Sequence, residues 1–353
     1  MYLYKENRMI KEDKLLIVSI IIVNYNGERF LEKLFNSLFQ QSLDSSKFEV
    51  IFVDNNSTDR SLEIVNNVLI KYPLLNLKII KNKVNLNFCK GNNIGLLYTK
   101  GKYLALLNND TYINSSWLKN LVNVLENDVS IGICGSKEIL YNNDGSIYAV
   151  SLGNFFGIFK IANKLNIVRS DDLVEGFFYE GGSSLIIRRD LIYRLGSLFD
   201  DTQNLGDLDL SWFARLQGFR VVTNTKSVCH HFYSHATKLV YKKIVDRKYH
   251  SYHDTIMAII KNYSFKTLIK RLPLYLIASM LFSLFESFML KEPVIFGWIR
   301  AIIWNLINLR DTYKKRMRIQ AIRKVPDDVI EKDMLPYPAE LYFLKLKLRG
   351  KNG

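Results

Sequence analysis

Three short polar clusters follow apolar runs of the sequence and carry the side chains best suited to bind a polar ligand. They are NYNG at 24–27, DNNS at 54–57 and NNDT at 108–111. Asp110 could hold Mg²⁺ or Mn²⁺, because a hard divalent cation needs only one or two carboxylates when phosphate oxygens complete its shell. Asp54 could accept hydrogen bonds from a nucleobase or from ribose hydroxyls. Each cluster alone is also ordinary turn chemistry, so its meaning depends on whether the fold brings the three together.

Two aspartates at the start of a predicted helix offer a second kind of chemistry. Asp207 and Asp209 stand in GDLDLSWFARLQGF at 206–219, where Gly218 marks the expected end of the helix. Residues two apart on a helix point about 200° away from each other, so the two carboxylates cannot share one task. One of them could accept a proton as a general base; if that is Asp207, Asp209 would cap the helix or pair with a basic residue such as Arg215. The alternative is that both carboxylates cap the helix.

Amide and imidazole side chains supply the remaining candidates. Asn92 and Asn93 begin a predicted helix, where their amides could face a sugar or a phosphate; capping of that helix is the alternative. In SVCHH at 227–231, His230 and His231 carry adjacent imidazoles, and a neutral imidazole can bind a metal or donate a hydrogen bond to an anion. A structural or surface histidine is the alternative.

An alternation of strands and helices must position these clusters. The predicted strands are 15–23, 48–54, 77–80, 103–107 and 131–135, and the predicted helices are 28–41, 57–69, 91–99 and 115–127. Such alternation predicts parallel βαβ units, and ligands of these sheets bind beyond the carboxyl ends of the strands. In this scheme the run at 15–23 is a buried strand rather than the apolar part of a signal peptide. Residues 136–205 predict a hairpin region and loops, with a strand and a short helix at 181–196.

Motifs that recur in a fixed order resemble those of a known family. They are VSIIIVNYNG, VIFVDNNSTDRS, NLNFCKGNNIG, YLALLNNDT, GGSSLIIRR and GDLDLSWFARLQGFRV, spread over residues 16–237. The set resembles the family 2 glycosyltransferases of the GT-A fold, and most closely their rhamnosyltransferase-type branch. The resemblance implies an α/β GT-A fold, with a mostly parallel central sheet and flanking helices. The composition of the C-terminal third adds a helical, membrane-associated region to this expectation.

The resemblance also implies roles for single residues. Asp207 would be the catalytic base, and Asp110 together with His230 would hold a divalent metal, Mg²⁺ or Mn²⁺. Asp54 would read the nucleoside base. The residues assigned to the nucleotide sugar are Val23, Asn24, Tyr25, Asp54, Asn56, Asn92 and Asn109.

The sequence departs from the family pattern at three places. The metal motif reads Asn-Asn-Asp at 108–110 instead of Asp-x-Asp, which leaves one carboxylate of two. Asn87 stands where the family usually has glycine, and asparagine is the residue that best tolerates a positive φ in its place. Gly206 replaces the family's glutamate before Asp207, so a supporting or acceptor-side carboxylate is missing.

The resemblance implies an inverting transfer of a sugar, rhamnose or another hexose, from a nucleotide-diphosphate sugar to a hydroxyl of a glycan acceptor in polysaccharide or glycoprotein glycan assembly. A carboxylate would take the proton of the hydroxyl, and the metal would stabilise the departing diphosphate. Two alternatives stay open. A non-catalytic nucleotide-sugar binder or assembly scaffold would explain Gly206 and the single carboxylate. A nucleotidyltransferase would need a glycine-rich basic loop after the first strand, and NYNGERF at 24–30 is poor in both residue types.

The C-terminal third carries most of the positive charge. Residues 241–353 hold 22 Lys and Arg against 10 Asp and Glu, or +12 of the net +15. Two apolar runs, 272–290 and 294–309, lie between basic flanks, a pattern typical of helices that meet anionic head groups. A transmembrane hairpin, or a helical bundle that forms a homo-oligomer interface, are the alternatives. No nucleic-acid recognition motif accompanies the basic residues, so we expect no nucleic-acid partner.

These patterns divide the chain into an N-terminal extension at 1–14, a catalytic domain at 15–240 and a helical region at 241–353. We expect the helical region to meet the membrane through residues 260–325 on its cytoplasmic face, where a nucleotide sugar is available and the acceptor would be lipid-linked. The three cysteines, Cys89, Cys134 and Cys229, are predicted to be buried free thiols.

Overall fold

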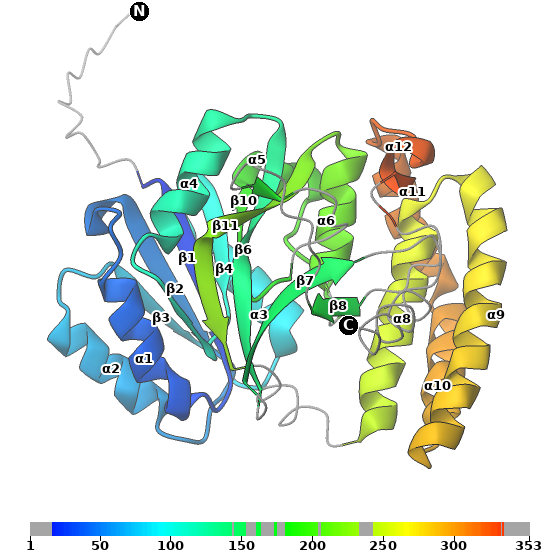
Figure 1. Ribbon diagram of the computed structural model, residues 1–353, viewed down its shortest axis with the longest axis horizontal. Helices are drawn as coiled ribbons and strands as arrows, with labels where there is room; N and C mark the ends of the chain where they lie inside the picture. Colours follow the sequence, from blue (N-terminus) through cyan, green and yellow to red (C-terminus); the bar gives the residue numbers. More distant parts are fainter. Residues whose placement is uncertain are drawn as a thin grey trace, which may run out of the picture.

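The computed structural model describes residues 16–142, 145–152, 160–163, 173–174, 181–203, 206–232, 243–332 and 334. The predicted N-terminal extension at 1–14 lies outside the described residues. Within them, an α/β sheet domain is followed by a group of helices that stands at one side of it (Figure 1).

The sheet domain begins with the predicted alternation of strands and helices. Its first half consists of β1 (Val18–Asn24), α1 (Glu28–Phe39), the short 3₁₀ helix Ser45–Lys47, β2 (Phe48–Asp54), α2 (Ser61–Lys71), β3 (Leu77–Lys81), α3 (Asn87–Leu96), β4 (Tyr103–Leu107), β5 (Thr111–Ile113) and α4 (Trp117–Asn127). Its second half consists of β6 (Ile131–Asn142), β7 (Gly145–Leu152), β8 (Lys160–Asn163), β9 (Leu173–Val174), β10 (Ser184–Arg188), α5 (Arg189–Leu195), α6 (Gly206–Leu216) and β11 (Arg220–His231).

The strands of the described residues form one mixed sheet whose main path runs in the order β3-β2-β1-β4-β10-β6-β11-β5, while β7 pairs with β6, β8 with β7 and β9 with β11 outside this path. The pairs β3–β2, β2–β1 and β1–β4 are parallel, as is β6–β11, whereas β10 runs antiparallel to both of its neighbours and β5 runs antiparallel to β11. The register pairs Asn24 with Asp54 at the carboxyl ends of β1 and β2. The predicted polar clusters therefore do meet at one edge of the sheet.

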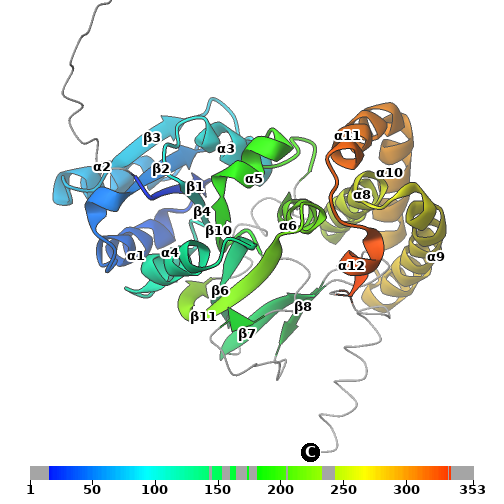
Figure 2. The same cartoon turned by 90° about the horizontal axis from the view of Figure 1, so that it is seen from above.

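Helices cover both faces of the sheet, which explains why its strands are apolar without alternation. On β1, Ile20 and Ile22 pack with α1 and α4, whereas Ile21 packs with α3, α6 and the helices that follow. Two apolar cores result, one on each side of the sheet. Figure 2 shows α1 and α4 on one side and α3, α5 and α6 on the other.

The C-terminal helices are α8 (Ile244–Asn262), α9 (Phe265–Leu290), α10 (Val294–Ile307), α11 (Leu309–Ala321) and α12 (Asp327–Glu331). Helix α8 lies between α6 and the long α9–α10 hairpin (Figure 2). Buried side chains of α8 belong to the same core as those of α6. The helical region is thus packed on the sheet domain through the helix that carries Asp207.

Two backbone predictions are confirmed by positive φ angles. Asn87 has a φ of 60°, so asparagine holds the turn at the position that the family fills with glycine. Gly218 has a φ of 84°, and the amide of Phe219 bonds to the carbonyl of Ala214 at 3.0 Å, which ends α6 in the manner expected of a C-terminal glycine. Helix α3 begins at Asn87 rather than at the predicted residue 91.

Candidate functional site

A buried polar network joins the carboxyl ends of β1, β2 and β4. The Asn24 amide nitrogen donates to Asp54 Oδ1 at 3.1 Å, and the Asn109 amide nitrogen donates to Asn24 Oδ1 at 2.7 Å. Ser57 bonds to both carboxylate oxygens of Asp54, through its hydroxyl at 2.6 Å and its amide at 3.0 Å. All three of Asn24, Asp54 and Asn109 are buried. The network fixes the relative position of three strand ends where a nucleotide is predicted to bind.

The other residues predicted to bind the nucleotide sugar differ in how accessible they are. Val23 and Tyr25 are partly exposed and Asn56 is exposed, so these three border open space at the sheet edge. Asn92 is buried and its amide nitrogen donates to the Phe88 carbonyl at 2.9 Å, within its own helix. Asn93 faces the opposite way, toward the segment that precedes α6. The structure thus brings Val23, Tyr25 and Asn56 to the edge and turns the Asn92 amide inward.

Asp110, at the end of the β4 cluster, faces a histidine of β11. That histidine is His231, whose Nε2 lies 3.0 Å from Asp110 Oδ1, and whose Nδ1 lies 2.5 Å from Glu138 Oε1. Ser183 donates to the same glutamate oxygen at 2.6 Å. Burial disfavours a charged imidazole, but the two carboxylates outweigh burial and raise the pKa of His231 to about 10. Burial would also raise the pKa of Glu138, yet the facing imidazolium holds it below its usual value.

His230, the predicted metal ligand, points to the other face of β11. Its ring stacks on Tyr112 with centroids 4.4 Å apart and planes 2° from parallel. Successive side chains of a strand alternate between faces, so only one of the two histidines can face Asp110. The structure gives that position to His231, in place of the predicted His230.

The Asp110–His231 pair offers an oxygen and a nitrogen donor 3.0 Å apart, and carboxylate oxygen with neutral imidazole nitrogen is a donor set that suits a divalent cation such as Mn²⁺. Glu138 then occupies the usual place of the carboxylate that orients a metal-binding imidazole through its other nitrogen. Among the described residues no group of three or more His, Cys, Asp or Glu side chains is arranged to hold a metal.

Asp207 lies in the first turn of α6 and is partly exposed. Its Oδ2 accepts a hydrogen bond from the Gly182 amide at 3.1 Å, and its Oδ1 accepts one from the Leu208 amide at 3.0 Å. Burial raises the pKa of Asp207, although both amide hydrogen bonds act in the opposite direction. A carboxylate with a raised pKa is a better proton acceptor near neutral pH.

The GGSS segment at 181–184 connects the two halves of this site. Gly182 contacts Asp207, and the next residue, Ser183, contacts Glu138 and through it His231 and Asp110. Asp207 and the Asp110–His231 pair are therefore tied to adjacent residues of one short segment.

Asp209 and Gly206 lie close to Asp207 in the sequence, but their neighbours belong to other parts of the fold. Asp209 pairs with Lys261 at 2.5 Å and accepts from the Asn262 amide nitrogen at 2.6 Å, so its partners come from α8. The sequence predicted instead that Asp209 caps its helix or pairs with a residue such as Arg215. At Gly206 a Cβ atom would stand 2.4 Å from the Phe199 ring, so the ring fills the space of the missing glutamate side chain.

The sequence did not indicate Glu138, and it predicted His230 where the structure has His231. The residues Ser227, Cys229 and His231 alternate as the buried positions of β11, and this period of two would have placed His231 inside with Cys229. Glu138 lies in β6 with no motif around it. It could have been found only as an acidic residue inside an apolar strand.

The mixed sheet with helices on both faces, followed by C-terminal helices, is the architecture of the GT-A class. The chain belongs to glycosyltransferase family 2, since the family model described as "Glycosyl transferase family 2" matches residues 19–196.

Curated relatives match a part of the chain. An uncharacterized glycosyltransferase of Haemophilus influenzae is 34% identical over 122 residues, which is 34% of this chain and 36% of that protein. The poly(ribitol-phosphate) beta-N-acetylglucosaminyltransferase TarS of Staphylococcus aureus is 36% identical over 103 residues, 29% of this chain and 18% of TarS. The matched segments therefore span well under two thirds of either relative.

Solved structures share the fold over most of the chain. The structure of residues 1–349 of S. aureus TarS with UDP-GlcNAc matches with a TM-score of 0.59 at 20% identity, covering 87% of this chain and 84% of the other. A mannosyltransferase of Pyrobaculum calidifontis, in complex with GDP-Man and Mn²⁺, matches with a TM-score of 0.54 at 14% identity, covering 87% and 86%. At these identities the likeness shows the fold alone.

Proposed function

We propose that this chain is an inverting glycosyltransferase that moves rhamnose or another hexose from a nucleotide-diphosphate sugar to a hydroxyl of a lipid-linked glycan. The observation that carries the proposal is the tie between Asp207 and the Asp110–His231 pair through Gly182 and Ser183. Displacement at an anomeric carbon needs a base on the acceptor side and charge stabilisation on the leaving-group side. Named relatives that transfer GlcNAc or glucose to poly(ribitol-phosphate) support a glycan acceptor.

In this mechanism Asp207 accepts the proton of the acceptor hydroxyl as that oxygen attacks the anomeric carbon. The amides of Gly182 and Leu208 orient its carboxylate, and burial raises its pKa toward the working range of a base. Attack from the face opposite the leaving diphosphate inverts the configuration at the anomeric carbon.

On the donor side, Asp54 accepts a hydrogen bond from a nucleoside N–H or from a ribose hydroxyl, next to Val23, Tyr25 and Asn56. Asp110 and His231 would hold Mg²⁺ or Mn²⁺, which supplies positive charge for the diphosphate when bound. The His231 imidazole would have to be neutral to hold the metal through Nε2. Its Nδ1–H would then donate a hydrogen bond to the Glu138 carboxylate, which orients the ring.

A membrane location is supported by the side-chain distribution of α9, which is inverted relative to a helix of a soluble bundle. Its buried positions are Tyr275, Ser279 and Ser283, while the exposed positions are apolar, with Phe288 81% exposed. Packing through small polar residues with apolar residues outside is typical of helices in lipid. The exposed apolar side chains of α9 and α10 include Ile277, Leu281, Leu284, Phe285, Phe288, Phe296, Ile303 and Leu306.

Further contacts fit helices that lie in a bilayer. Glu286, the one acidic residue of α9, faces inward and pairs with Lys248 of α8 at 2.5 Å. The indole nitrogen of Trp298 donates to the Ser279 hydroxyl at 2.9 Å, so the polar groups of the α9–α10 hairpin bond to each other. Helix α9 has 26 residues and is long and apolar enough to cross a bilayer. We propose that acyl chains of the cytoplasmic leaflet, rather than a second copy of the chain, cover this surface.

A donor screen tests the proposed function. The purified chain in detergent is incubated with a panel of nucleotide sugars, with Mg²⁺, with Mn²⁺ or with chelator, and nucleoside diphosphate release is measured. We expect one donor to be used and chelator to lower its rate. Donor binding without release under all conditions would instead favour the assembly scaffold.

A further inference from the structure

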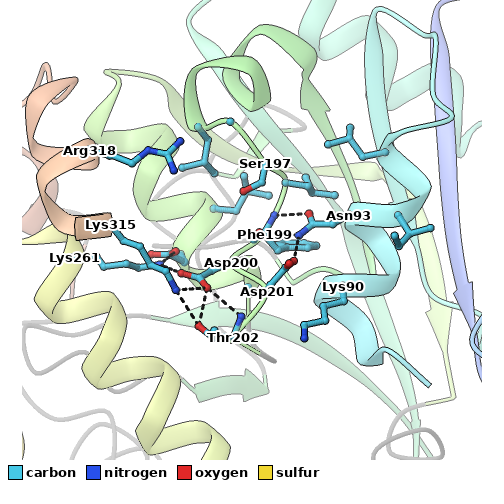
Figure 3. A pocket seen from close by; sticks show the side chains of 18 of the residues that line it. Lys90, Asn93, Ser197, Phe199, Asp200, Asp201, Thr202, Lys261, Lys315 and Arg318 are labelled. Atoms are coloured by element: carbon cyan, nitrogen blue, oxygen red, sulfur yellow. Dashed lines mark hydrogen bonds and ion pairs between the residues drawn. The ribbon is translucent and has the colours of Figure 1, made fainter. Parts of the chain in front are cut away.

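The segment that precedes α6 is fixed from the donor side by one asparagine. The Asn93 amide nitrogen donates to the Phe199 carbonyl at 2.9 Å and to Asp201 Oδ1 at 2.7 Å, and its oxygen accepts from the Phe199 amide at 3.0 Å (Figure 3). Asn93 belongs to α3, and the residue before it is Asn92, which is predicted to bind the nucleotide sugar. The start of the segment is thereby attached to the part of the fold that is predicted to bind the nucleotide sugar.

The same segment is fixed from the other side by the C-terminal helices. Asp200 Oδ2 lies 3.1 Å from the Lys261 ammonium of α8, and its Oδ1 lies 3.0 Å from the Lys315 ammonium of α11 (Figure 3). These two cations hold the pKa of Asp200 well below its usual value despite burial. The carboxylate therefore bridges two helices that the sheet domain does not contain.

Lys261 also contacts the helix that carries the base. Its ammonium lies 2.5 Å from Asp209 Oδ2, and its side chain is 2% exposed. Asp209 is two residues from Asp207 on α6, and the neighbouring Asn262 bonds to its second oxygen at 2.6 Å. One buried cation thus contacts both the segment before α6 and the first turns of α6.

A buried ion pair is a poor device for stability alone, because desolvation offsets much of its attraction and apolar side chains pack as well. What it fixes is geometry, since a buried charge must keep its partners within hydrogen-bond distance. The base of a transfer reaction needs such fixing, as a displacement of about 1 Å can cost about a hundredfold in rate.

We propose that Lys261 is a positioning residue for Asp207, acting through Asp200 and Asp209, so that the C-terminal helices complete the catalytic centre as well as anchor it. The proposal rests on the proposed function, in which Asp207 is the base. It predicts that the sheet domain depends on α8 for turnover even when it binds the donor normally.

The test compares Lys261→Met with Lys261→Arg and with the control Arg271→Met. Arg271 of α9 is partly buried and pairs with Glu331 at 2.8 Å, so its loss removes an ion pair between two residues of the helical region. We expect kcat of Lys261→Met to fall between about tenfold and a hundredfold, with the donor KM within about twofold. Lys261→Arg keeps the charge and should recover most of the loss, and Arg271→Met should keep kcat. Equal kcat in Lys261→Met and Arg271→Met would overturn the proposal.

Hydrogen exchange of the peptide that covers residues 206–212 provides a readout that needs no activity. We expect faster exchange in Lys261→Met and wild-type exchange in Arg271→Met. If the wild-type chain transfers no sugar, the proposed function fails, while unchanged exchange in Lys261→Met would reject the positioning role separately. Should Lys261→Met not fold, Asp200→Asn serves in its place: a fall in kcat of about threefold or more supports the proposal, and an unchanged kcat rejects it.

Discussion

Substitution of Gly206 tests the packing around the base most sharply. A Cβ atom there would stand 2.4 Å from Phe199 Cδ1, 2.8 Å from its Cγ and 2.9 Å from the Cys89 sulfur. Carbon atoms in contact are about 3.5–4.0 Å apart, so the Phe199 ring would have to move by about 1 Å. The ring has little freedom to do so, because it is buried, packs on Phe88 with centroids 5.4 Å apart, and has its backbone held by Asn93.

We therefore expect Gly206→Ala to lower the free energy of unfolding by about 1–3 kcal/mol through overpacking. Replacing glycine by alanine inside a helix normally raises the free energy of unfolding by up to about 1 kcal/mol, and by less at the first helical position. A net decrease would therefore show that overpacking outweighs helix propensity. A loss of this size lowers the melting temperature by a few degrees. Gly206→Glu, which restores the family residue, should be worse, because a longer side chain meets the same ring.

Urea and thermal unfolding followed by circular dichroism measure both variants. Gly181→Ala is the control, because the nearest atom to its added Cβ is the Ser183 hydroxyl at 3.7 Å. Placing Gly206→Ala in a Phe199→Ala background should remove most of its cost, since the two changes act on one contact. A Gly206→Ala chain as stable as wild type would refute the reasoning that Phe199 occupies the place of the glutamate.

The remaining predictions concern the base, the histidines and the membrane. Asp207→Asn should lower turnover by about 10²–10⁴-fold with donor affinity nearly unchanged. Because the pKa of Asp207 is raised from 3.8, the wild-type kcat/KM should fall as pH decreases through a value above 3.8. A fall in kcat/KM that begins only below pH 3.8 would contradict the argument that desolvation raises this pKa. His231→Ala should weaken Mn²⁺ affinity measured by titration calorimetry, whereas His230→Ala should not; equal effects would argue against the Asp110–His231 site. Phe285→Asp with Phe288→Asp should reduce flotation with anionic vesicles, and unchanged flotation would favour a protein partner for that surface.

The fold was largely predictable from the first 135 residues, where burial on both faces produces apolar runs such as 48–54. The position of β10 was not. It inserts antiparallel between β4 and β6, although it lies far from both in sequence. No local sequence pattern predicts such pairing, since the register of a strand depends on contacts between distant segments. The left-handed backbone of Asn87 could be expected, because few residue types adopt it.

The candidate site was predictable where chemistry is local. Asp54, Asn24 and Asn109 follow their strands directly and do form one network. The choice between His230 and His231 depended on strand phase, which Cys229, predicted to be buried, could have set in favour of His231. The partner of Asp209 could not be foreseen, because Lys261 is 52 residues away on a helix whose docking no motif encodes.

The central claim, transfer from a nucleotide sugar with Asp207 as base, is tested most directly by comparing wild type with Asp207→Asn in one assay. Nucleoside diphosphate release and the anomeric configuration of the product are followed by NMR, with the donor that the screen identifies, a glycan acceptor and Mn²⁺. We predict acceptor-dependent release by wild type, an inverted product, and a loss of about 10²–10⁴-fold in Asp207→Asn. Equal release by the two proteins, or a product of retained configuration, would contradict the claim.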